Sequence, residues 1–401
     1  MRICVDYALI GTNLDLERNI CISIENNRIS QITGYTSTSP DIYIPSSIAI
    51  PITANCHAHC LDAALPSIGE DLELELVVSP RRGIKYAEIS RCSIDKLTEC
   101  AKLYLAHAFR QGVIVVASYA ELESLGVEVL ARASSSIPVI VVPFPQPCPS
   151  DISSVEKYLA ILKTMRRLGM NTLLDLEFED LKELAKAAQH LSAHIHVHVS
   201  ETERLYRAKD FERALELKPR AAIHCTYLGK EEALELSRVG IWIVPCPRSN
   251  TFLVGRVMDP NVFVEVFLET KRIALGTDNA AWFTPSVLRE IEHYYMVSRV
   301  IARDRMLFVK ALLYAATIGC FRCLGIEYRG IYENENAAML IVQVPELRYS
   351  YSPLHTLVER LSSSRVIAVF GENIVPLETV SMHTPIKGVE KIRRSFEQSL
   401  Q

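Results

Sequence analysis

Residues 94–121, IDKLTECAKLYLAHAFRQGVIVVASYAE, place an amphipathic helical segment directly before a short apolar run. Apolar residues recur at helical spacing as far as Gln111, and from Gly112 the pattern changes to the β-branched run of a buried strand. This alternation of helix and buried strand is the unit from which parallel α/β folds are built. We therefore expect an α/β protein made of such units.

The same alternation continues through the middle of the chain, where eight apolar runs occur. They are SIAIPITANCHAH, GVIVVASYAE, IPVIVVPFP, NTLLDLEF, HIHVHVSE, AAIHCTY, GIWIVPCP and RIALGTDNA. Eight units favour a closed (β/α)8 TIM barrel, in which functional residues collect at the carboxyl ends of the strands. An open doubly wound sheet is the alternative, but neither G-x-G-x-x-G nor G-x-x-x-x-G-K-[ST], the phosphate-binding turns typical of such sheets, occurs in the sequence.

The two ends of the chain differ from the middle, because short strand-like runs there are separated by turn residues. The runs are ICVDYALI, NICISIENNRISQIT with its Asn26-Asn27 turn, IYIPSSIAI, AAMLIVQV, and SRVIAVFGENIVP with its Gly371-Glu372 turn. We predict a small β-sandwich domain formed by residues 1–50 together with 330–380. The barrel then spans residues 51–329, and residues 381–401 form a C-terminal helical tail.

The composition is that of a globular protein with a large core, since 49% of the 401 residues are hydrophobic and 22% are charged. The formal net charge of −4 argues against general binding to nucleic acids or membrane surfaces. No signal-peptide core follows Arg2 and Asp6, and runs such as IPVIVVPF are far shorter than the roughly 20 residues that span a bilayer. We expect a cytoplasmic protein with no nucleic-acid or membrane partner.

The 11 cysteines are scattered and do not resemble the framework of a small disulfide-rich domain. Some could still pair if the protein comes from a hyperthermophile, so disulfide pairing stays open. Cys320 and Cys323 form a C-x-x-C, but no second pair completes a zinc site. We expect both to be packing residues.

Histidines occur at the carboxyl ends of two predicted strands. His57 and His59 are two residues apart, so on a strand both imidazoles lie on one face and can converge on one metal ion. In HIHVHVSE three histidines share a face, and His198 lies nearest the carboxyl end, with Glu201 three residues later. Taken alone, each pattern also fits hydrogen-bonded structural histidines.

Two further candidates follow other strands. His224 ends the run AAIH, and Asp278 in IALGTDNA lies beyond Ala274 and Gly276, small residues on the same face. By itself His224 fits a core histidine, and Asp278 fits the N-cap of the next helix. The carboxyl ends of barrel strands surround one opening, so these residues and the histidines above are expected to meet there.

Taken together, PITANCHAHC, HVSE, IHCTYL, CPRSN and LGTDNA make the chain resemble the amidohydrolase superfamily over nearly its whole length. The resemblance is to the aminohydrolase branch, which includes chlorohydrolases, guanine deaminases and methylthioadenosine/adenosylhomocysteine deaminases. It implies that His57, His59, His198 and Asp278 bind a metal. The fourth run contains no lysine that could be carboxylated to bridge two metals, which favours one metal ion.

This ligand set also makes chemical sense. A divalent metal held by three neutral nitrogens and one carboxylate lowers the pKa of a bound water toward 7. Zinc is the first choice, and iron(II) accepts similar ligands. Glu201 is expected to move protons between the water and the departing ammonia, and Asp278 to accept a proton from the attacking water. His224 is expected to orient that water and to stabilise the tetrahedral intermediate.

Substrate contacts are predicted from two loops. In the resembling family the CPRSN segment lines the pocket, which makes Arg248 and Asn250 candidates. Arg82, in the basic loop SPRRGIKYAE, is a candidate for a carboxylate or phosphate group. Glu121 is a candidate for a substrate hydroxyl. The alternative for Arg248 and Asn250 is a loop held by local hydrogen bonds. The alternative for Arg82 is a solvated charged loop.

We therefore predict a metal-dependent hydrolytic deaminase of an amino-substituted nitrogen heterocycle, such as a purine, a pterin or a nucleoside. Hydrolysis of an amide or displacement of a halide at the same site is the alternative, since each reaction delivers hydroxide to an electron-poor carbon. A non-catalytic scaffold is a further alternative. The substrate is a small molecule, and a homodimer is implied by the resemblance alone.

Overall fold

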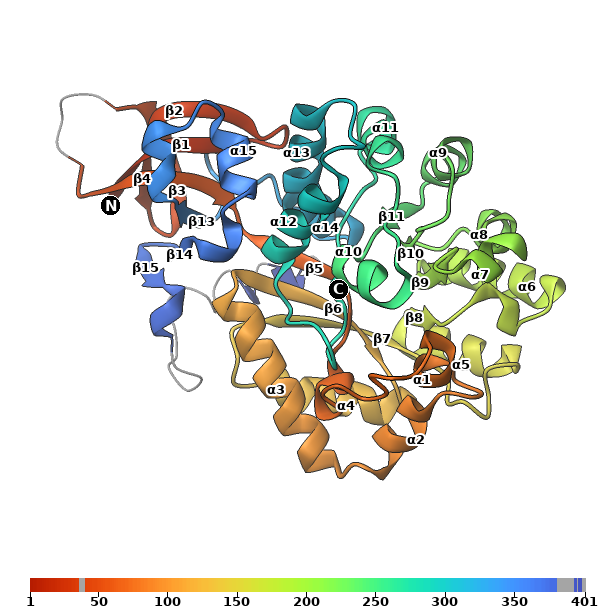
Figure 1. Cartoon of the computed structure of the whole chain (residues 1–401). Helices are drawn as coiled ribbons and strands as arrows, with labels where there is room; N and C mark the ends of the chain where they lie inside the picture. Colours follow the sequence, from red (N-terminus) through yellow and green to blue (C-terminus); the bar gives the residue numbers. More distant parts are fainter. Residues whose placement is uncertain (36–39, 381–392, 395, 399–401) are drawn as a thin grey trace.

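One sheet of seven strands takes its strands from both ends of the chain (Figure 1). The computed structural model describes residues 1–35, 40–380, 393–394 and 396–398. The strand order is β15-β14-β13-β4-β1-β2-β3. The strands are β1 (Arg2–Ile10), β2 (Asp15–Glu25), β3 (Arg28–Gly34), β4 (Ile42–Pro51), β13 (Ala338–Gln343), β14 (Arg365–Phe370) and β15 (Asn373–Pro376).

The two ends join where β13 pairs antiparallel with β4, with Ile341 opposite Ala49. The predicted turn at Asn26-Asn27 is confirmed, and both residues adopt the left-handed conformation that a tight hairpin requires. One face of the sheet buries its own small apolar core, which includes Ile3, Ile22 and Ile341. The packing of this sheet into a two-layer sandwich and the predicted domain boundaries stay predictions.

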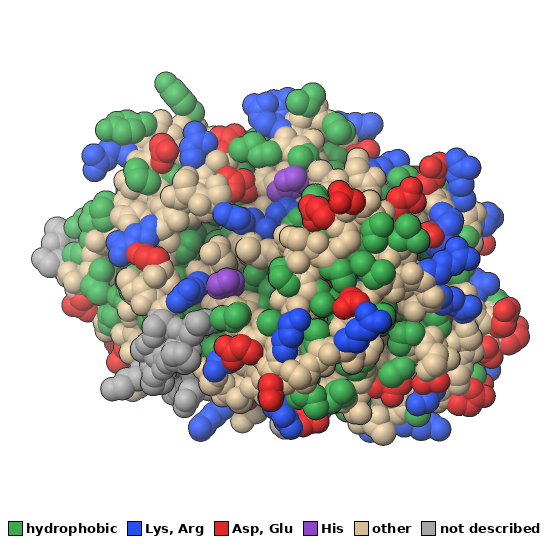
Figure 2. All heavy atoms as spheres, turned by 60° about the horizontal axis from the view of Figure 1, so that its bottom comes forward, with side chains coloured by type: hydrophobic (Ala, Val, Ile, Leu, Met, Phe, Trp, Pro, Cys, Tyr) green, Lys and Arg blue, Asp and Glu red, His purple; other side chains and the backbone are tan. Residues whose placement is uncertain are grey.

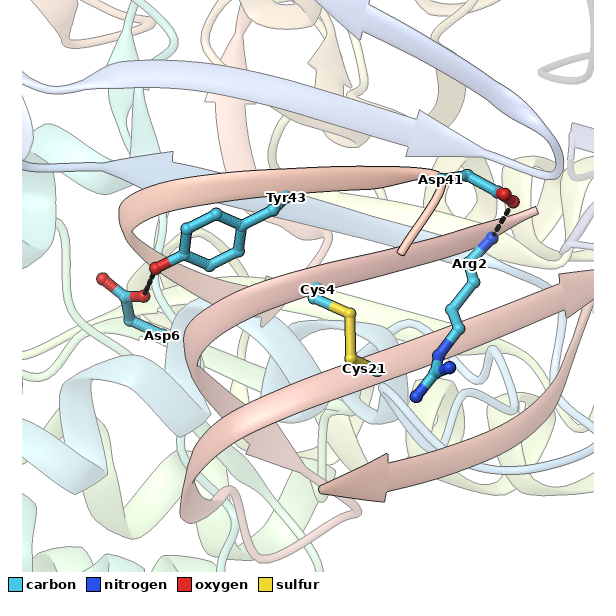
Figure 3. Close-up of a disulfide and its surroundings, with 6 residues drawn as sticks. All are labelled: Arg2, Cys4, Asp6, Cys21, Asp41 and Tyr43. Carbon is cyan, nitrogen blue, oxygen red and sulfur yellow. Dashed lines mark hydrogen bonds between the residues drawn. A yellow bond between two sulfur atoms is a disulfide. The ribbon is translucent and has the colours of Figure 1, made fainter. Parts of the chain in front are cut away.

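A disulfide links the first two strands of this sheet, where Cys4 lies directly opposite Cys21 (Figure 3). Asp6 lies where the register between β1 and β4 is irregular. Its carboxylate accepts hydrogen bonds from Tyr43 Oη at 2.5 Å and from Ser46 N at 2.7 Å. The hydrogen bond to Asp6 raises the pKa of Tyr43 to about 12. These links connect β1 to both of its neighbours in the sheet.

The middle of the chain forms two parallel sheets of four strands each, with helices between successive strands (Figure 1). One sheet has the order β12-β5-β6-β7 and the other β11-β10-β9-β8. The strands are β5 (Thr53–His59), β6 (Val113–Ala120), β7 (Ile140–Pro145), β8 (Arg167–Met170), β9 (His194–Val199), β10 (Ala221–His224), β11 (Trp242–Val244) and β12 (Asp278–Asn279).

Residues 272–277 connect the two sheets through backbone hydrogen bonds. Ala274 N donates to Ile243 O in β11, and Cys56 N in β5 donates to Leu275 O, both at 3.0 Å. On the opposite side, β7 and β8 lie against each other. Closure of a complete barrel stays a prediction.

Fifteen α-helices lie between Leu74 and Val358, and most of them follow a parallel strand. They are α1 (Leu74–Val78), α2 (Ile84–Arg91), α3 (Ile94–Arg110), α4 (Glu123–Ser134), α5 (Val155–Met165), α6 (Phe178–Leu191), α7 (Glu203–Arg207), α8 (Asp210–Leu217), α9 (Lys230–Arg238), α10 (Pro247–Ser249), α11 (Pro260–Thr270), α12 (Val287–Ser298), α13 (Arg305–Tyr314), α14 (Cys320–Cys323) and α15 (Pro353–Val358).

The fourth strand was predicted in the wrong place. The run NTLLDLEF contains a 3₁₀ turn at Leu173–Asp175, and the strand is β8, just before it. The preceding helix ends at Met165 because Arg166 adopts a left-handed conformation, and Gly169 lies inside β8. A side chain at Gly169 would come within 3.0 Å of Phe144 O and of the Tyr119 ring, which explains the glycine.

Most of the predicted C-terminal tail lies outside the described residues, but 393–394 and 396–398 are described and are helical. Cys320 and Cys323 are buried and unpaired, as expected for packing residues. Within the described chain, the helical run Arg305–Cys323 is long and apolar enough to span a bilayer, yet 78% of its most apolar window is buried inside the protein, as in a core helix. Figure 2 shows basic, acidic and apolar side chains interspersed over one face.

The disulfide is expected to stabilise the chain-end sheet. It closes a loop with a sequence separation of 17, so replacing Cys4 and Cys21 by Ser should lower the free energy of unfolding by about 3 kcal/mol. Urea unfolding of the double variant and of a Cys148→Ser control, which removes an unpaired thiol, measures this. Thiol titration of the unfolded, unreduced wild type should find nine thiols, and eleven would contradict the disulfide.

Candidate metal centre and active site

Four side chains meet at the carboxyl ends of β5, β9 and the short strand β12. His57 Nε2 lies 3.3 Å from Asp278 Oδ1 and 3.3 Å from His198 Nε2. His59 Nε2 lies 3.4 Å from the same Asp278 oxygen. Ligands at 2.0–2.1 Å from a tetrahedral metal ion lie about 3.3 Å from one another, so this spacing and donor set fit one divalent metal.

Burial sets the protonation of these groups. It lowers the pKa of His57 to about 3 and the pKa of His198 well below its usual range, so both imidazoles are neutral. Burial opposes ionisation of Asp278, but the hydrogen bond with His57 and the neighbouring His224 and His59 hold its pKa well below its usual range. His57 and His198 therefore offer neutral nitrogens and Asp278 an ionised carboxylate, the forms that bind a metal.

The carboxylate of Asp278 is held by residues that the sequence analysis did not identify. Ser249 Oγ donates to Asp278 Oδ2 at 2.5 Å, which leaves Oδ1 facing the histidines. Asn55 Nδ2 donates to Thr277 Oγ1 at 2.7 Å, and Thr277 N donates to Asn55 Oδ1 at 3.2 Å, so the residue before Asp278 is tied to β5. Ser249 lies inside the CPRSN motif, whereas nothing in the sequence marked Asn55.

His224 is oriented by Asn250. Asn250 Oδ1 accepts a hydrogen bond from Cys246 N at 3.2 Å, so its Nδ2 faces His224 Nδ1 at 3.0 Å and donates to it. Because Nδ1 accepts this hydrogen bond, the ring N–H of His224 is on Nε2, which lies 3.7 Å from Glu201 Oε1. His224 therefore presents an N–H donor at the base of the site.

Glu201 lies beside His198 and His224, and their potential ligand atoms are all within 4.8 Å of one another. Burial raises the pKa of Glu201, while His224 partly offsets this effect. The backbone next to Glu201 is held by Asp210, which accepts hydrogen bonds from Ser200 N and Ser200 Oγ, each at 2.6 Å. A carboxyl with a raised pKa at this position is suited to accept and donate a proton.

A cavity of about 430 Å³ opens above these residues. Its lining includes His59, His198, Glu201, His224 and Asp278. The first βα loop contributes Arg81 and Arg82, and the segment after β8 contributes Asn171 and Asp175. The volume is that of a pocket for a small molecule.

Comparison with known proteins identifies the family. Residues 48–370 match the amidohydrolase family. The chain belongs to this family. As an amidohydrolase it is a hydrolase that acts on C–N bonds.

Two relatives resemble this amidohydrolase over most of their length. A putative aminohydrolase of Methanothermobacter thermautotrophicus is 24% identical over 374 residues, which cover 90% of this chain and 94% of the relative. A 5-methylthioadenosine/S-adenosylhomocysteine deaminase of Caldicellulosiruptor saccharolyticus is 23% identical in an alignment of 424 positions, gaps included, that covers 95% of each chain.

The crystal structure of an adenosine deaminase from Xanthomonas campestris with bound zinc superimposes with a TM-score of 0.74 at 16% identity. The superposition covers 100% of this chain and 98% of that one. This similarity shows that the amidohydrolase has a TIM-barrel-type α/β fold.

The predicted substrate-binding residues lie in different surroundings. Arg82 lies in the lining of the cavity, and its contact with a substrate stays a prediction. Asn250 does not line it, since its side chain holds His224. Arg248 does not line it either, because its Nε lies 2.6 Å from Glu290 Oε1 and its guanidinium donates to Thr284 O at 2.6 Å. The structure therefore gives Arg248 and Asn250 internal partners in place of the predicted contacts with the substrate.

Lys85 and Glu121 also differ from their predicted surroundings. Lys85 is 2% exposed and lies in no solvated loop. Glu121 is fully buried and accepts from His59 Nδ1 at 2.6 Å, so it faces a predicted ligand and not a substrate hydroxyl.

The Arg248–Glu290 pair is expected to stabilise the fold. Glu290 is fully buried, so Arg248→Ala leaves an unpaired buried carboxylate and should lower the free energy of unfolding by about 3–5 kcal/mol. An Arg238→Ala control removes an exposed ion pair to Glu269 and should leave the urea midpoint unchanged. A wild-type midpoint with a raised KM in Arg248→Ala would instead support a contact with the substrate.

Proposed function

We propose that this amidohydrolase is a metal-dependent hydrolytic deaminase of an amino-substituted nitrogen heterocycle, such as a purine, a pterin or a nucleoside. One observation carries the proposal. Three imidazole nitrogens and one carboxylate oxygen converge at the base of a cavity, with Glu201 beside them and outside the predicted ligand set. A metal that activates water, together with a glutamate that moves protons without binding the metal, suits the hydrolytic removal of ammonia.

The relatives support this choice. Two of them are named as an aminohydrolase and as a deaminase of adenosine derivatives, and the superimposed adenosine deaminase holds zinc. We propose zinc as the resident metal, with His57, His59, His198 and Asp278 as its ligands. The proposal includes a closed barrel with a β-sandwich domain, a cytoplasmic location and a homodimer.

The side chains around the metal have distinct roles. When bound, a divalent metal supplies Lewis acidity that makes water nucleophilic near neutral pH. Glu201 takes a proton from the attacking water and passes it to the leaving amino group, which departs as ammonia. The Nε2–H of His224 orients the water and donates to the oxygen that becomes negatively charged. Asp278 accepts the second proton of the water through its carboxylate and passes it to the ring nitrogen of the product, so the two protons of the water end on ammonia and on the product.

The upper part of the cavity binds the rest of the substrate. The side-chain oxygen Oδ1 of Asn171 accepts hydrogen bonds from Tyr86 Oη at 3.1 Å and Gln146 Nε2 at 2.9 Å. The Nδ2 amide of Asn171 therefore does not face Tyr86 or Gln146. We propose that it donates a hydrogen bond to an acceptor atom of the heterocycle. Arg82 at the rim binds a polar or anionic substituent.

Metal analysis combined with an ammonia-release assay tests the function. We expect about one zinc ion per chain and ammonia from one class among aminated purines, pterins, pyrimidines and triazines. Metal without ammonia from any class would contradict deamination and favour amide or halide hydrolysis. Protein that neither holds nor binds metal would contradict the metal site.

Two variants separate proton transfer from metal binding. Glu201→Gln should keep the metal and lower kcat by about 10²–10⁴-fold, because the amide cannot transfer the proton. His198→Ala should lose the metal, because a ligand is removed. Metal content and kcat measured on both variants check this, with Glu203→Gln, an exposed residue two positions away, as the control. Near-normal kcat in Glu201→Gln would show that Glu201 is not the proton carrier.

A further inference from the structure

Three charged side chains are buried behind His59, on the side away from the predicted metal. They are Asp62 in the turn after β5, Lys85 in α2 and Glu121 just after β6, and each is at most 2% exposed. Lys85 Nζ lies 2.8 Å from Asp62 Oδ2 and 2.8 Å from Glu121 Oε1. We call these three residues the His59 charge cluster.

The cluster contacts His59 through its second ring nitrogen. Glu121 Oε1 lies 2.6 Å from His59 Nδ1, while Nε2 faces Asp278 on the other side of the ring. An imidazole that offers the Nε2 lone pair to a metal carries its proton on Nδ1. Glu121 Oε1 is the acceptor in place for that proton.

Lys85 cannot replace Glu121 in this role. Its Nζ lies 3.1 Å from His59 Nδ1, but an ammonium group has only hydrogens to donate. When Nδ1 carries a proton, the His59 N–H and the Lys85 ammonium group must both donate to Glu121 Oε1. Lys85 therefore fixes the position of the Glu121 carboxylate.

We propose that Glu121 is a positioning residue for the metal ligand His59 and that Lys85 holds Glu121 in place. The inference rests on the metal site proposed above. The hydrogen bond from Nδ1 to Glu121 fixes the tautomer and the ring orientation of His59 and makes Nε2 a stronger donor to the metal.

The charges of the cluster support this role. Two carboxylates and one ammonium carry a net charge of −1, buried within hydrogen-bond distance of the His59 ring. Burying such a group is costly and contributes little to stability by itself. A nearby divalent cation would balance the excess negative charge.

The test compares Glu121→Gln with Asp62→Asn in the full-length protein after removal of metal by a chelator. Both variants remove one negative charge from the same cluster, but of the two carboxylates only that of Glu121 is hydrogen-bonded to His59. Zn²⁺ affinity is measured by competition with a chromophoric chelator. Glu121→Gln should weaken it by about 10–100-fold, and Asp62→Asn should change it much less.

Two further readouts separate positioning from folding. The visible spectrum of the Co²⁺-substituted protein reports on the metal ligands and should shift in Glu121→Gln but not in Asp62→Asn. The Tm of the metal-free variants shows whether each remains folded. If Glu121→Gln does not fold, Glu121→Asp takes its place, and its shorter carboxylate should also weaken Zn²⁺ binding.

The outcomes are distinct. Wild-type Zn²⁺ affinity in Glu121→Gln overturns the inference and leaves the metal site intact. Equal weakening in Asp62→Asn and Glu121→Gln also overturns it, because net charge would then explain both. Failure of the wild-type protein to bind Zn²⁺ overturns the proposed metal site itself.

Discussion

The arrangement of the site depends on one constraint. Three imidazole nitrogens and one carboxylate oxygen must face the position of a single metal ion. The contacts of 3.3–3.4 Å join imidazole rings to one another and to an ionised carboxylate, and they require His57 and His59 on one strand face with Asp278 directly beside them. The backbone is strained to achieve this, since both Asp278 and His224 adopt the left-handed conformation, with φ of 60° and 72°. Strain of this kind persists only where surrounding contacts enforce it, and Ser249, Thr277 and Asn250 provide them.

Much of this arrangement could be predicted from the sequence, because it follows from short-range periodicity. The spacing of His57 and His59 places both rings on one side of a strand, and the strand-like runs at the chain ends have clear turn residues at Asn26-Asn27. The carboxyl ends of successive parallel strands share one side of a fold, so candidate residues from distant segments could be expected to meet.

The parts that the sequence did not predict depend on contacts between distant segments. In the sequence, Lys85 is one basic residue of the charged segment SPRRGIKYAE. Its burial depends on ion pairs with Asp62 and Glu121, which belong to other segments of the chain. Arg248 and Asn250 belong to a motif near the site, but their hydrogen bonds lead to Glu290 and His224. The fourth strand was misplaced because the left-handed residue that ends the preceding helix is an arginine, which carries no turn signal.

The two glutamates beside the proposed metal site show how environment divides roles between identical side chains. Burial acts on both. At Glu201 it prevails and the pKa rises, whereas at Glu121 the neighbouring Lys85 and His59 overcome it and lower the pKa to about 2. Groups whose surroundings move their pKa values apart are the usual basis for assigning acid–base roles. A carboxyl whose pKa is raised takes up a proton more readily, whereas one whose pKa is lowered stays ionised and accepts hydrogen bonds from its neighbours. The opposite shifts therefore favour Glu201 as the proton carrier and Glu121 as the fixed partner of His59.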